Sequence, residues 1–273
     1  MRRLFALVVF VLLLAAMAIG AIAVRDLRRG YRSPLGARVV HFSLHSRLLR
    51  RQLDEVLVTP RGGGRGRSLL VFLHGRGASP GSNLTDPFFR GLRALGRRAP
   101  NVLFANGGDH SYWHNRADGP WGSYVLREAI PAALRRSGAD PHRVAIGGIS
   151  MGGFGALDLG RIEPKRFCAV GGHSPAVYVR QADELGNAFD NSADFARHDL
   201  IRLAHNRSPY KAPVWIDVGT RDHLRPAATM LARELRSDGA DVTFHVWPGT
   251  HEGRYWDAHF AQYLRFYVDA CTG

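Results

Sequence analysis

The most reactive candidate in this sequence is a serine in a glycine-rich turn. Residues 146–155 read IGGISMGGFG, and Gly148-Ile149-Ser150-Met151-Gly152 matches the pattern G-x-S-x-G. An apolar run precedes the motif and a segment with helical spacing follows it, so Ser150 is expected at a sharp strand-to-helix turn. We predict that Ser150 is a nucleophile; the alternative is a glycine-rich loop that contains an incidental serine.

A serine hydroxyl is a weak nucleophile, so it needs a histidine base and an acid that orients the base. At such a turn these partners follow the serine in the order acid, then histidine. Asp222 comes just after the β-branched run at 213–218, and His251 lies in a Pro-Gly loop after the alternating run at 242–247. The order predicts Asp222 as the orienting acid and His251 as the base.

Other acids and histidines fit these roles less well. Asp217 lies inside its predicted strand, where a buried structural carboxylate is the expected interpretation, and Asp257 begins the last predicted helix as a cap or first-turn charge. Of the thirteen histidines, His245 falls within a strand and His259 on a helix. His251 is the one of these three that follows a strand in a loop.

An oxyanion-binding loop is predicted upstream of the serine. The apolar run at 68–73 ends in His74-Gly75-Arg76, and backbone N–H groups in such a loop can face the carbonyl oxygen of a bound acyl group. Two donors are predicted, the N–H of Arg76 and the N–H of Met151. His74 and Gly75 are also candidates for the lining of the substrate cleft.

Several of these segments together resemble a known family. The chain is similar, over roughly residues 38–268, to the α/β-hydrolase "putative esterase" group that holds esterase D, feruloyl esterases and the mycobacterial mycolyltransferases. The resemblance is carried by VVHFSLHSRLLRRQLDEVLVTP, LLVFLHGRGAS, VAIGGISMGGFGAL, DVGTRDHL and WPGTHEGRYW. It implies the nucleophile at Ser150, the acid at Asp222, the base at His251 and oxyanion donors at Arg76 and Met151. The mycolyltransferases use a glutamate as the acid, so the resemblance does not extend to a trehalose substrate.

The hydrophobic pattern predicts an α/β fold with a mostly parallel central sheet and helices on both faces. After an antiparallel pair near 38–44 and 53–59, predicted strands alternate with predicted helices. The strands are at 68–73, 101–106, 143–148, 167–172, 213–218 and 241–247, and the helices are near 86–98, 122–137, 151–162, 225–238 and 256–269. Residues 38–273 therefore form one α/β-hydrolase catalytic domain. Ligands in such sheets bind at the carboxyl ends of the strands, where the motifs fall.

Two segments interrupt this alternation. The stretch 107–122 is rich in aromatic residues, and we expect Trp113, Trp121 and, from a later strand end, His173 to line the substrate cleft. His110 and His114 have a ligand-like spacing, but aromatic stacking within the loop is the preferred interpretation, and no metal is predicted. The polar excursion at 174–211 is expected to form a small cap over Ser150.

The N-terminus is predicted to be a targeting element. Arg2 and Arg3 precede an uncharged run from Leu4 to Val24, close to the roughly 20 residues that span a bilayer. Residues 1–24 are thus a signal peptide or a membrane anchor, residues 25–37 a basic linker, and the domain is exported. Cleavage after the small residues at 21–23 remains an alternative to retention.

The net charge of +14 arises almost entirely from arginine, and an ordinary solvated, arginine-biased surface is the preferred interpretation. Association with anionic lipids or a cell-envelope polymer, through the arginines between 25 and 51, is the alternative. The absence of a recognition motif argues against nucleic acid as a partner. Cys168 and Cys271 either pair or remain free, with Cys168 in a predicted core strand.

These observations predict a serine hydrolase that cleaves a small-molecule, lipid or sugar ester through an acyl-enzyme, with no metal or organic cofactor. Two alternatives remain open. One is an acyltransferase that delivers the acyl group to an envelope alcohol or sugar. The other is a catalytically silent protein of the same fold that binds the envelope.

Overall fold

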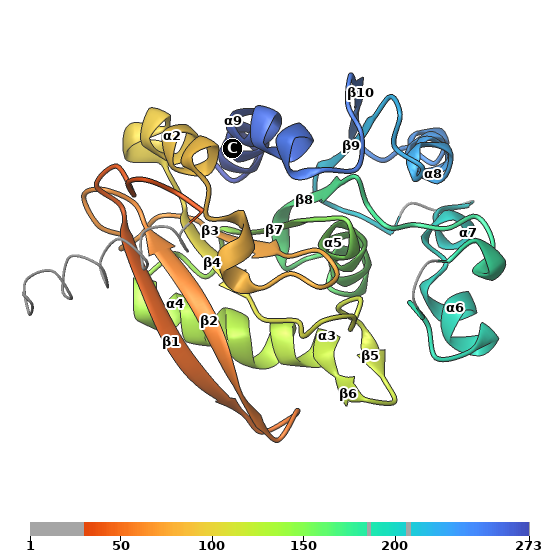
Figure 1. Ribbon diagram of the computed structural model, residues 1–273, viewed down its shortest axis with the longest axis horizontal. Coiled ribbons are helices and arrows are strands. Elements are labelled where there is room, and N and C mark those ends of the chain that lie inside the picture. The colour runs from red at the N-terminus through yellow and green to blue at the C-terminus, as the bar shows by residue number, and fades with distance from the viewer. Residues whose placement is uncertain (1–29, 185–186, 206–208, 273) are drawn as a thin grey trace, which may run out of the picture.

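An eight-stranded sheet organises the chain in the computed structural model, which describes residues 30–184, 187–205 and 209–272 (Figure 1). The strand order is β1-β2-β4-β3-β7-β8-β9-β10. The pairs β1·β2 and β2·β4 are antiparallel, and every later neighbouring pair is parallel. The strands are β1 (Arg38–Ser46), β2 (Arg51–Thr59), β3 (Leu69–Leu73), β4 (Asn101–Ala105), β7 (Val144–Ile149), β8 (Phe167–His173), β9 (Val214–Gly219) and β10 (Val242–Trp247).

The central strands are apolar without interruption because both of their faces are covered. In β3, Leu69, Val71 and Leu73 belong to one hydrophobic core, whereas Leu70 and Phe72 belong to the other. Alternate side chains of a strand point to opposite faces, so a strand between two layers of helices needs apolar residues at every position.

Helices cover both faces of the sheet, as the sequence predicts. Helices α2 (Asp86–Ala94) and α9 (Gly253–Ala270) contribute to one core (Figure 1). Helices α4 (Ile130–Ser137), α5 (Met151–Ile162) and α8 (Arg225–Ser237) contribute to the other. The predicted helix at 122–137 is divided: α3 (Trp121–Tyr124) continues through a π-helical turn (Val125–Ala129) into α4. A two-stranded hairpin, β5 (Asn115–Arg116) with β6 (Gly119–Pro120), precedes it.

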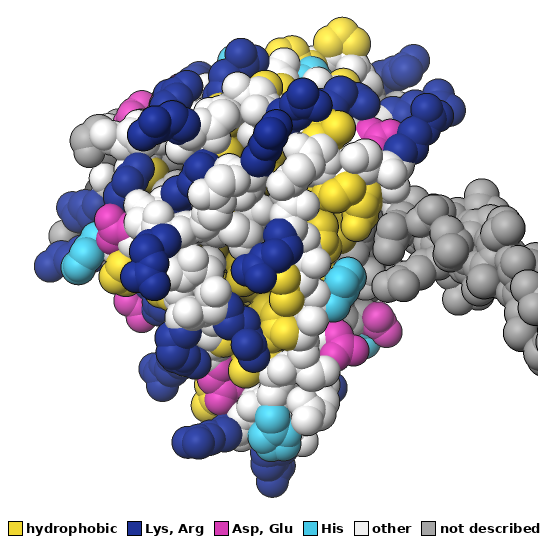
Figure 2. Space-filling model, turned by 90° about the vertical axis from the view of Figure 1, so that its left-hand side faces the viewer, with side chains coloured by type: hydrophobic (Ala, Val, Ile, Leu, Met, Phe, Trp, Pro, Cys, Tyr) yellow, Lys and Arg dark blue, Asp and Glu magenta, His cyan; other side chains and the backbone are white. Residues whose placement is uncertain are grey.

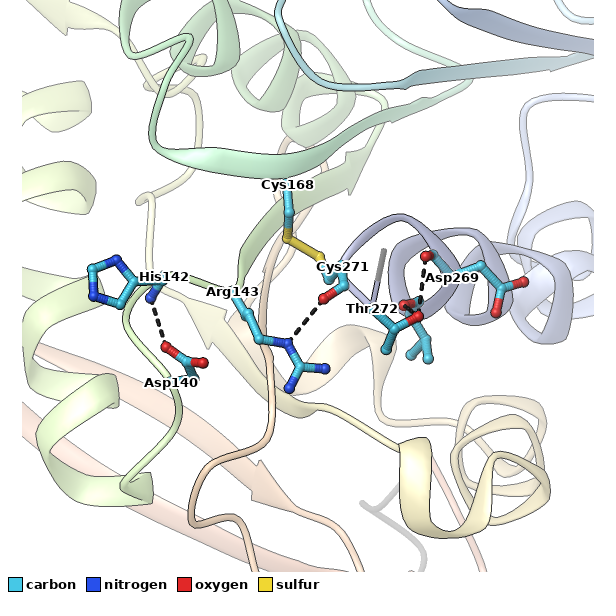
Figure 3. The surroundings of a disulfide bond; sticks show 8 residues. Asp140, His142, Arg143, Cys168, Asp269, Cys271 and Thr272 are labelled. Atoms are coloured by element: carbon cyan, nitrogen blue, oxygen red, sulfur yellow. Dashed lines mark hydrogen bonds between the residues drawn. A yellow bond between two sulfur atoms is a disulfide. The ribbon is translucent and has the colours of Figure 1, made fainter.

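A disulfide joins the two cysteines, which settles the alternative that the sequence leaves open. Cys168 on β8 is bonded to Cys271 at the end of α9 (Figure 3). Arg143 Nε donates a hydrogen bond to the backbone oxygen of Cys271 at 2.9 Å. The sequence separation is 103 residues. A crosslink closing a loop of about this length is expected to stabilise the fold by about 4.7 kcal/mol in the chain-entropy account.

The excursion after β8 carries α6 (Ser192–His198) and α7 (Leu200–Ala204). It packs on both α5 and α8. The rings of Phe154 on α5 and Phe189 are 5.6 Å apart, the hydroxyl of Tyr210 donates to the carbonyl of Leu157 on α5 at 2.9 Å, and α7 lies against α8. The excursion thus extends the core that includes α5 and α8.

The predicted signal or anchor at 1–24, and most of the predicted linker, lie outside the described residues. In the ranges that the structure describes, none of the helices is long and apolar enough to cross a membrane.

Candidate active site

Ser150 sits on a strained turn between β7 and α5. Its backbone has φ 56° and ψ −116°, a conformation that costs a non-glycine residue free energy and that persists only when the surroundings impose it. Those surroundings are crowded. A Cβ on Gly148 would lie 2.5 Å from the carbonyl oxygen of Gly152, and one on Gly152 would lie 2.0 Å from that of Leu73. The two motif glycines are therefore required by the close approach of backbone to backbone.

Ser150, His251 and Asp222 form a continuous chain of hydrogen bonds. The Oγ of Ser150 lies 2.9 Å from Nε2 of His251, and Nδ1 of His251 lies 2.9 Å from Oδ2 of Asp222. The structure therefore brings together the three side chains that the sequence selects. Their separation along the chain is bridged by the parallel strands, whose carboxyl ends lie at one edge of the sheet.

The loops that carry Asp222 and His251 are joined by backbone hydrogen bonds. Thr220 N–H donates to Trp247 O at 2.8 Å, and Arg221 N–H donates to Gly249 O at 2.9 Å. A Cβ on Gly219 would lie 2.6 Å from that same Gly249 oxygen. The distance between acid and base is thus fixed by backbone contacts as well as by their own hydrogen bond.

The Asp222 carboxyl is held in its ionised form. Burial alone would raise its pKa, but hydrogen bonds from the His251 ring and the Leu224 N–H outweigh burial and hold the pKa below its ordinary value. The Leu224 N–H donates to Oδ1 at 2.9 Å, which leaves Oδ2 for the imidazole. A charged acceptor at this place keeps the proton of a neutral His251 on Nδ1 and the lone pair on Nε2, which faces Ser150.

Asp217, the rival acid, lies in a different network. It is fully buried, and its two oxygens accept from Nδ1 of His173 (2.7 Å), Trp215 Nε1 (2.7 Å), Tyr255 OH (2.8 Å) and Tyr263 OH (2.9 Å). The prediction of a buried structural carboxylate is confirmed. Asp257 is placed less accurately by the sequence: α9 begins at Gly253, so Asp257 lies in the second turn, where it accepts from Thr85 Oγ1 at 2.7 Å.

His74 fixes the loop beside the serine. Its Nδ1 lies 2.9 Å from Gly75 O, and the Gly107 N–H donates to its Nε2 at 3.1 Å. Burial lowers the pKa of His74, so the ring is neutral with its proton on Nδ1. Since the C=O and N–H of a trans peptide point in opposite directions, holding the Gly75 carbonyl also sets the direction of the Arg76 N–H.

The Met151 N–H is oriented in a similar way. The carbonyl of Ser150 accepts from the N–H groups of Phe154 and Ala176, both at 3.0 Å, so the N–H of Met151 points away from that carbonyl. Met151 is also the first residue of α5, whose N–H groups have no partner within the helix and whose dipole favours negative charge. The loop at Gly75 lies close by, since a Cβ on Gly75 would be 3.5 Å from the Ser150 Cβ.

A cavity of about 360 Å³ opens onto Ser150 and His251. The residues from 75 to 85 form one wall and α9 with the turn before it forms the other. Phe260 and Trp256 supply apolar surface, while Arg76 and Asp257 supply charge. The cavity is near the lower end of the range for small-molecule sites.

The prediction that aromatic residues of 107–122 line the cleft is wrong. Trp113 is 0% exposed and Trp121 3% exposed, and neither borders this cavity. The Trp113 side chain fits inside the core because position 155 is a glycine: a Cβ on Gly155 would lie only 2.3 Å from the Cβ of Trp113. His173 is also misplaced by the sequence: it is fully buried, with Nε2 2.8 Å from the hydroxyl of Tyr267.

The predictions that His74 and Gly75 line the substrate cleft have different outcomes. Gly75 borders the cavity, as predicted, whereas His74 is only 1% exposed and lies behind the loop. The expected cap over Ser150 is wrong for the part of the excursion that the structure describes, because none of those residues borders the cavity. Asn187 reaches only a neighbouring hollow, beside Arg76 and His110.

Two clusters of potential metal ligands occur in the described residues, His114 with Asp194 and His198, and Asp222 with His223 and His251. The first is an ion-pair network: Asp194 also pairs with Arg197 at 3.0 Å, and Asp158, which accepts from His198 at 2.9 Å, pairs with Arg161 at 2.6 Å. This network joins the excursion to α5 and to the loop of His114. The second cluster contains the hydrogen bond that orients His251.

The sequence did not single out four residues that line the cavity, Asn83, Thr85, Trp256 and Phe260. Trp256 and Phe260 follow His251 by five and nine residues, and Trp256 is the last residue of the WPGTHEGRYW segment, so for the tryptophan the sequence did carry a signal. Asn83 and Thr85 also border the cavity, but they reach it through a 3-10 turn (Pro80–Asn83) whose path no local pattern indicates.

The strand order, the strained serine turn and the order Ser, Asp, His define an α/β-hydrolase fold. Solved structures with this fold include a ferulic acid esterase, at 19% identity over 86% of this chain and 99% of that chain, with a TM-score of 0.74. An S-formylglutathione hydrolase from Agrobacterium tumefaciens matches at 18% identity over 88% and 98%, with a TM-score of 0.71. MPT51 from Mycobacterium tuberculosis matches at 18% identity over 86% and 99%, with a TM-score of 0.67.

The sequence matches the model of the family described as "Putative esterase" over residues 103–267, and the chain belongs to that family. The resemblance predicted from the motifs is confirmed. The protein is therefore an enzyme of the ester-hydrolase class, a carboxylic ester hydrolase or a related acyltransferase.

Proposed function

We propose that the protein is a serine esterase in which Ser150, His251 and Asp222 act as a catalytic triad. The observation that carries this proposal is the unbroken chain of hydrogen bonds from Ser150 Oγ through His251 to Asp222, on a backbone whose strain exposes the serine. A serine hydroxyl in an ordinary turn has no need of an imidazole that a carboxylate orients toward it.

In the proposed reaction, Ser150 Oγ attacks the ester carbonyl while His251 Nε2 takes the hydroxyl proton. The N–H groups of Arg76 and Met151 stabilise the oxygen that becomes negative. The tetrahedral intermediate then expels the alcohol, which receives the proton from His251, and the acyl group remains on Ser150. A water molecule then attacks the acyl carbonyl, with His251 again as the base, and the carboxylic acid is released from Ser150. Asp222 stabilises the imidazolium that forms at each stage and remains ionised.

We expect a preference for short acyl chains, because the cavity beside Ser150, which Phe260 and Trp256 help to line, has a volume of only about 360 Å³. The test is the rate of hydrolysis of a series of p-nitrophenyl esters of increasing acyl length, together with labelling by a fluorophosphonate probe. Labelling should occur at Ser150, identified by peptide mass spectrometry. A wild-type protein that hydrolyses none of the esters and labels at no serine would instead be a silent binder.

We also propose that the domain lies outside the cytoplasmic membrane and stays attached through residues 4–24. The uncharged run after Arg2 and Arg3 supports this location, and so does the disulfide of Cys168 with Cys271, because such bonds persist in oxidising compartments.

Cell fractionation tests the location. Chains that retain Met1 are expected in the membrane pellet, with activity accessible to an ester that does not enter cells. A soluble extracellular form that begins near Val24 would replace attachment by release. Activity confined to the cytosol would contradict both.

A further inference from the structure

A second cavity, remote from Ser150, has an unusual composition. Its volume is about 750 Å³, and it lies between the start of the described chain, the loop at 60–67 and α2 with the turn after it. Its lining includes five arginines and no acidic residue: Arg61, Arg65, Arg67, Arg93 and Arg97. We refer to it as the arginine cavity.

Most of these arginines have no anionic partner. Arg67 is used structurally, because its guanidinium donates to the carbonyls of Gly96 and Ala99, both at 3.1 Å. Within the described ranges, the other four form no ion pair with an acid, and all four are exposed. Four guanidinium groups around one cavity repel one another, so an anion placed among them would lower that repulsion.

The cavity also has apolar surface. Leu35, Phe89 and Leu92 border it, together with Pro34 and Ala37. Phe89 and Leu92 are 1% and 2% exposed and belong to the core under α2, so the accessible apolar surface comes from the half-buried Pro34, Leu35 and Ala37. A ligand that fills this space therefore meets hydrocarbon on one side and guanidinium groups on the other, which is the pattern of an anionic amphiphile.

The position of the cavity indicates the source of that amphiphile. Figure 2 shows this side of the molecule, where blue Lys and Arg side chains greatly outnumber the magenta acids and surround yellow apolar surface. The described chain begins here at Gly30, and Arg32 N–H is bonded to Asp86 at the start of α2 at 2.8 Å. The uncharged run from Leu4 to Val24 ends only a few residues earlier in the sequence. A domain attached through that run would keep this side close to the lipid headgroups.

We propose that the arginine cavity binds the phosphate headgroup of an anionic membrane phospholipid, with the first part of the acyl chains against Pro34, Leu35 and Ala37. The contact would orient the domain on the membrane surface. It involves no residue of the proposed triad, so it stands or falls separately from ester hydrolysis.

The full chain, held in a non-ionic amphipol, provides the test. Its affinity is measured for dihexanoyl phosphatidylglycerol, for dihexanoyl phosphatidylcholine, which has the same tails, and for glycerol phosphate and inorganic phosphate, which have no tails. Phosphatidylglycerol is expected to bind most tightly, by at least tenfold. Hydrogen exchange should locate the binding through protection of residues 60–67 and 89–99.

Two matched variants decide whether the cavity is responsible. Arg93→Gln with Arg97→Gln is expected to weaken phosphatidylglycerol binding about 30-fold, since one arginine near an anionic surface is worth about 1 kcal/mol and 1.4 kcal/mol is tenfold. Arg90→Gln with Arg127→Gln removes the same charge from exposed positions outside the cavity and should change the affinity less than about twofold.

Several results would overturn the proposal. Equal losses in the two variants would show diffuse attraction of charge without a site. If phosphatidylcholine binds as tightly as phosphatidylglycerol, the arginines do not recognise the headgroup. If inorganic phosphate binds as tightly as phosphatidylglycerol, the cavity is a site for free anions. Failure of every probe to bind would show that the cavity is not a lipid site.

Discussion

Ser150→Ala is expected to lower kcat for a short p-nitrophenyl ester by at least about 10³-fold, because nucleophile and base act as a unit and either is ineffective alone. The methyl side chain occupies the same strained backbone position and removes only the hydroxyl, so the fold is expected to remain. The residual rate would come from the N–H groups of Arg76 and Met151 and from binding. The measurement is kcat of the purified variant, with circular dichroism to verify folding.

Ser237→Ala is the matched control. Ser237 is exposed at the end of α8, where its Oγ donates to the Glu234 carbonyl at 2.8 Å, remote from the cavity beside Ser150. Its kcat should equal that of the wild type. If the kcat of Ser150→Ala equals that of this control, Ser150 is not the nucleophile.

The sequence predicts the site well where the chemistry depends on local backbone. The strained turn at Ser150 needs glycines because Gly148 and Gly152 lie against other backbone atoms, and this requirement produces a short motif that can be recognised in the sequence. The acid and the histidine follow strand ends, and parallel strands bring their carboxyl ends to one edge. The order of elements along the chain is therefore enough to place Asp222 and His251 beside Ser150.

Some side-chain positions depend on contacts between distant segments and are not encoded locally, and the predictions for Trp113 and His173 are wrong for this reason. Trp113 points into the core because Gly107 and Gly155 leave room for its ring, and these glycines lie on different segments. His173 ends a strand, as a cleft residue would, but the ring of Tyr263 from α9 stacks on it at 3.6 Å. The pairing of Cys168 with Cys271 likewise depends on α9 returning beside β8. Each case depends on a contact between segments far apart in the sequence.

Asp222→Asn is expected to lower turnover by up to about 10⁴-fold while the protein stays folded. One amide oxygen can still accept from the Leu224 N–H, as Oδ1 does in the wild type. The NH₂ group then faces His251 Nδ1, which must act as an acceptor, so the ring proton moves to Nε2. A ring protonated at Nε2 cannot take the proton of Ser150. The measurement is kcat across pH, beside the melting temperature of the variant.

Asp217→Asn provides the contrast, since it makes the same chemical change at the rival acid. The carboxylate of Asp217 accepts from four buried donors, whereas an amide has one acceptor oxygen, so donors are left without partners at about 1–3 kcal/mol each. We expect a lower melting temperature and fewer folded molecules, but a kcat per fluorophosphonate-reactive serine within about tenfold of the wild type, because the bond between His251 and Asp222 is intact. The opposite pattern, with kcat kept in Asp222→Asn and lost in Asp217→Asn, would transfer the role of the orienting acid to Asp217.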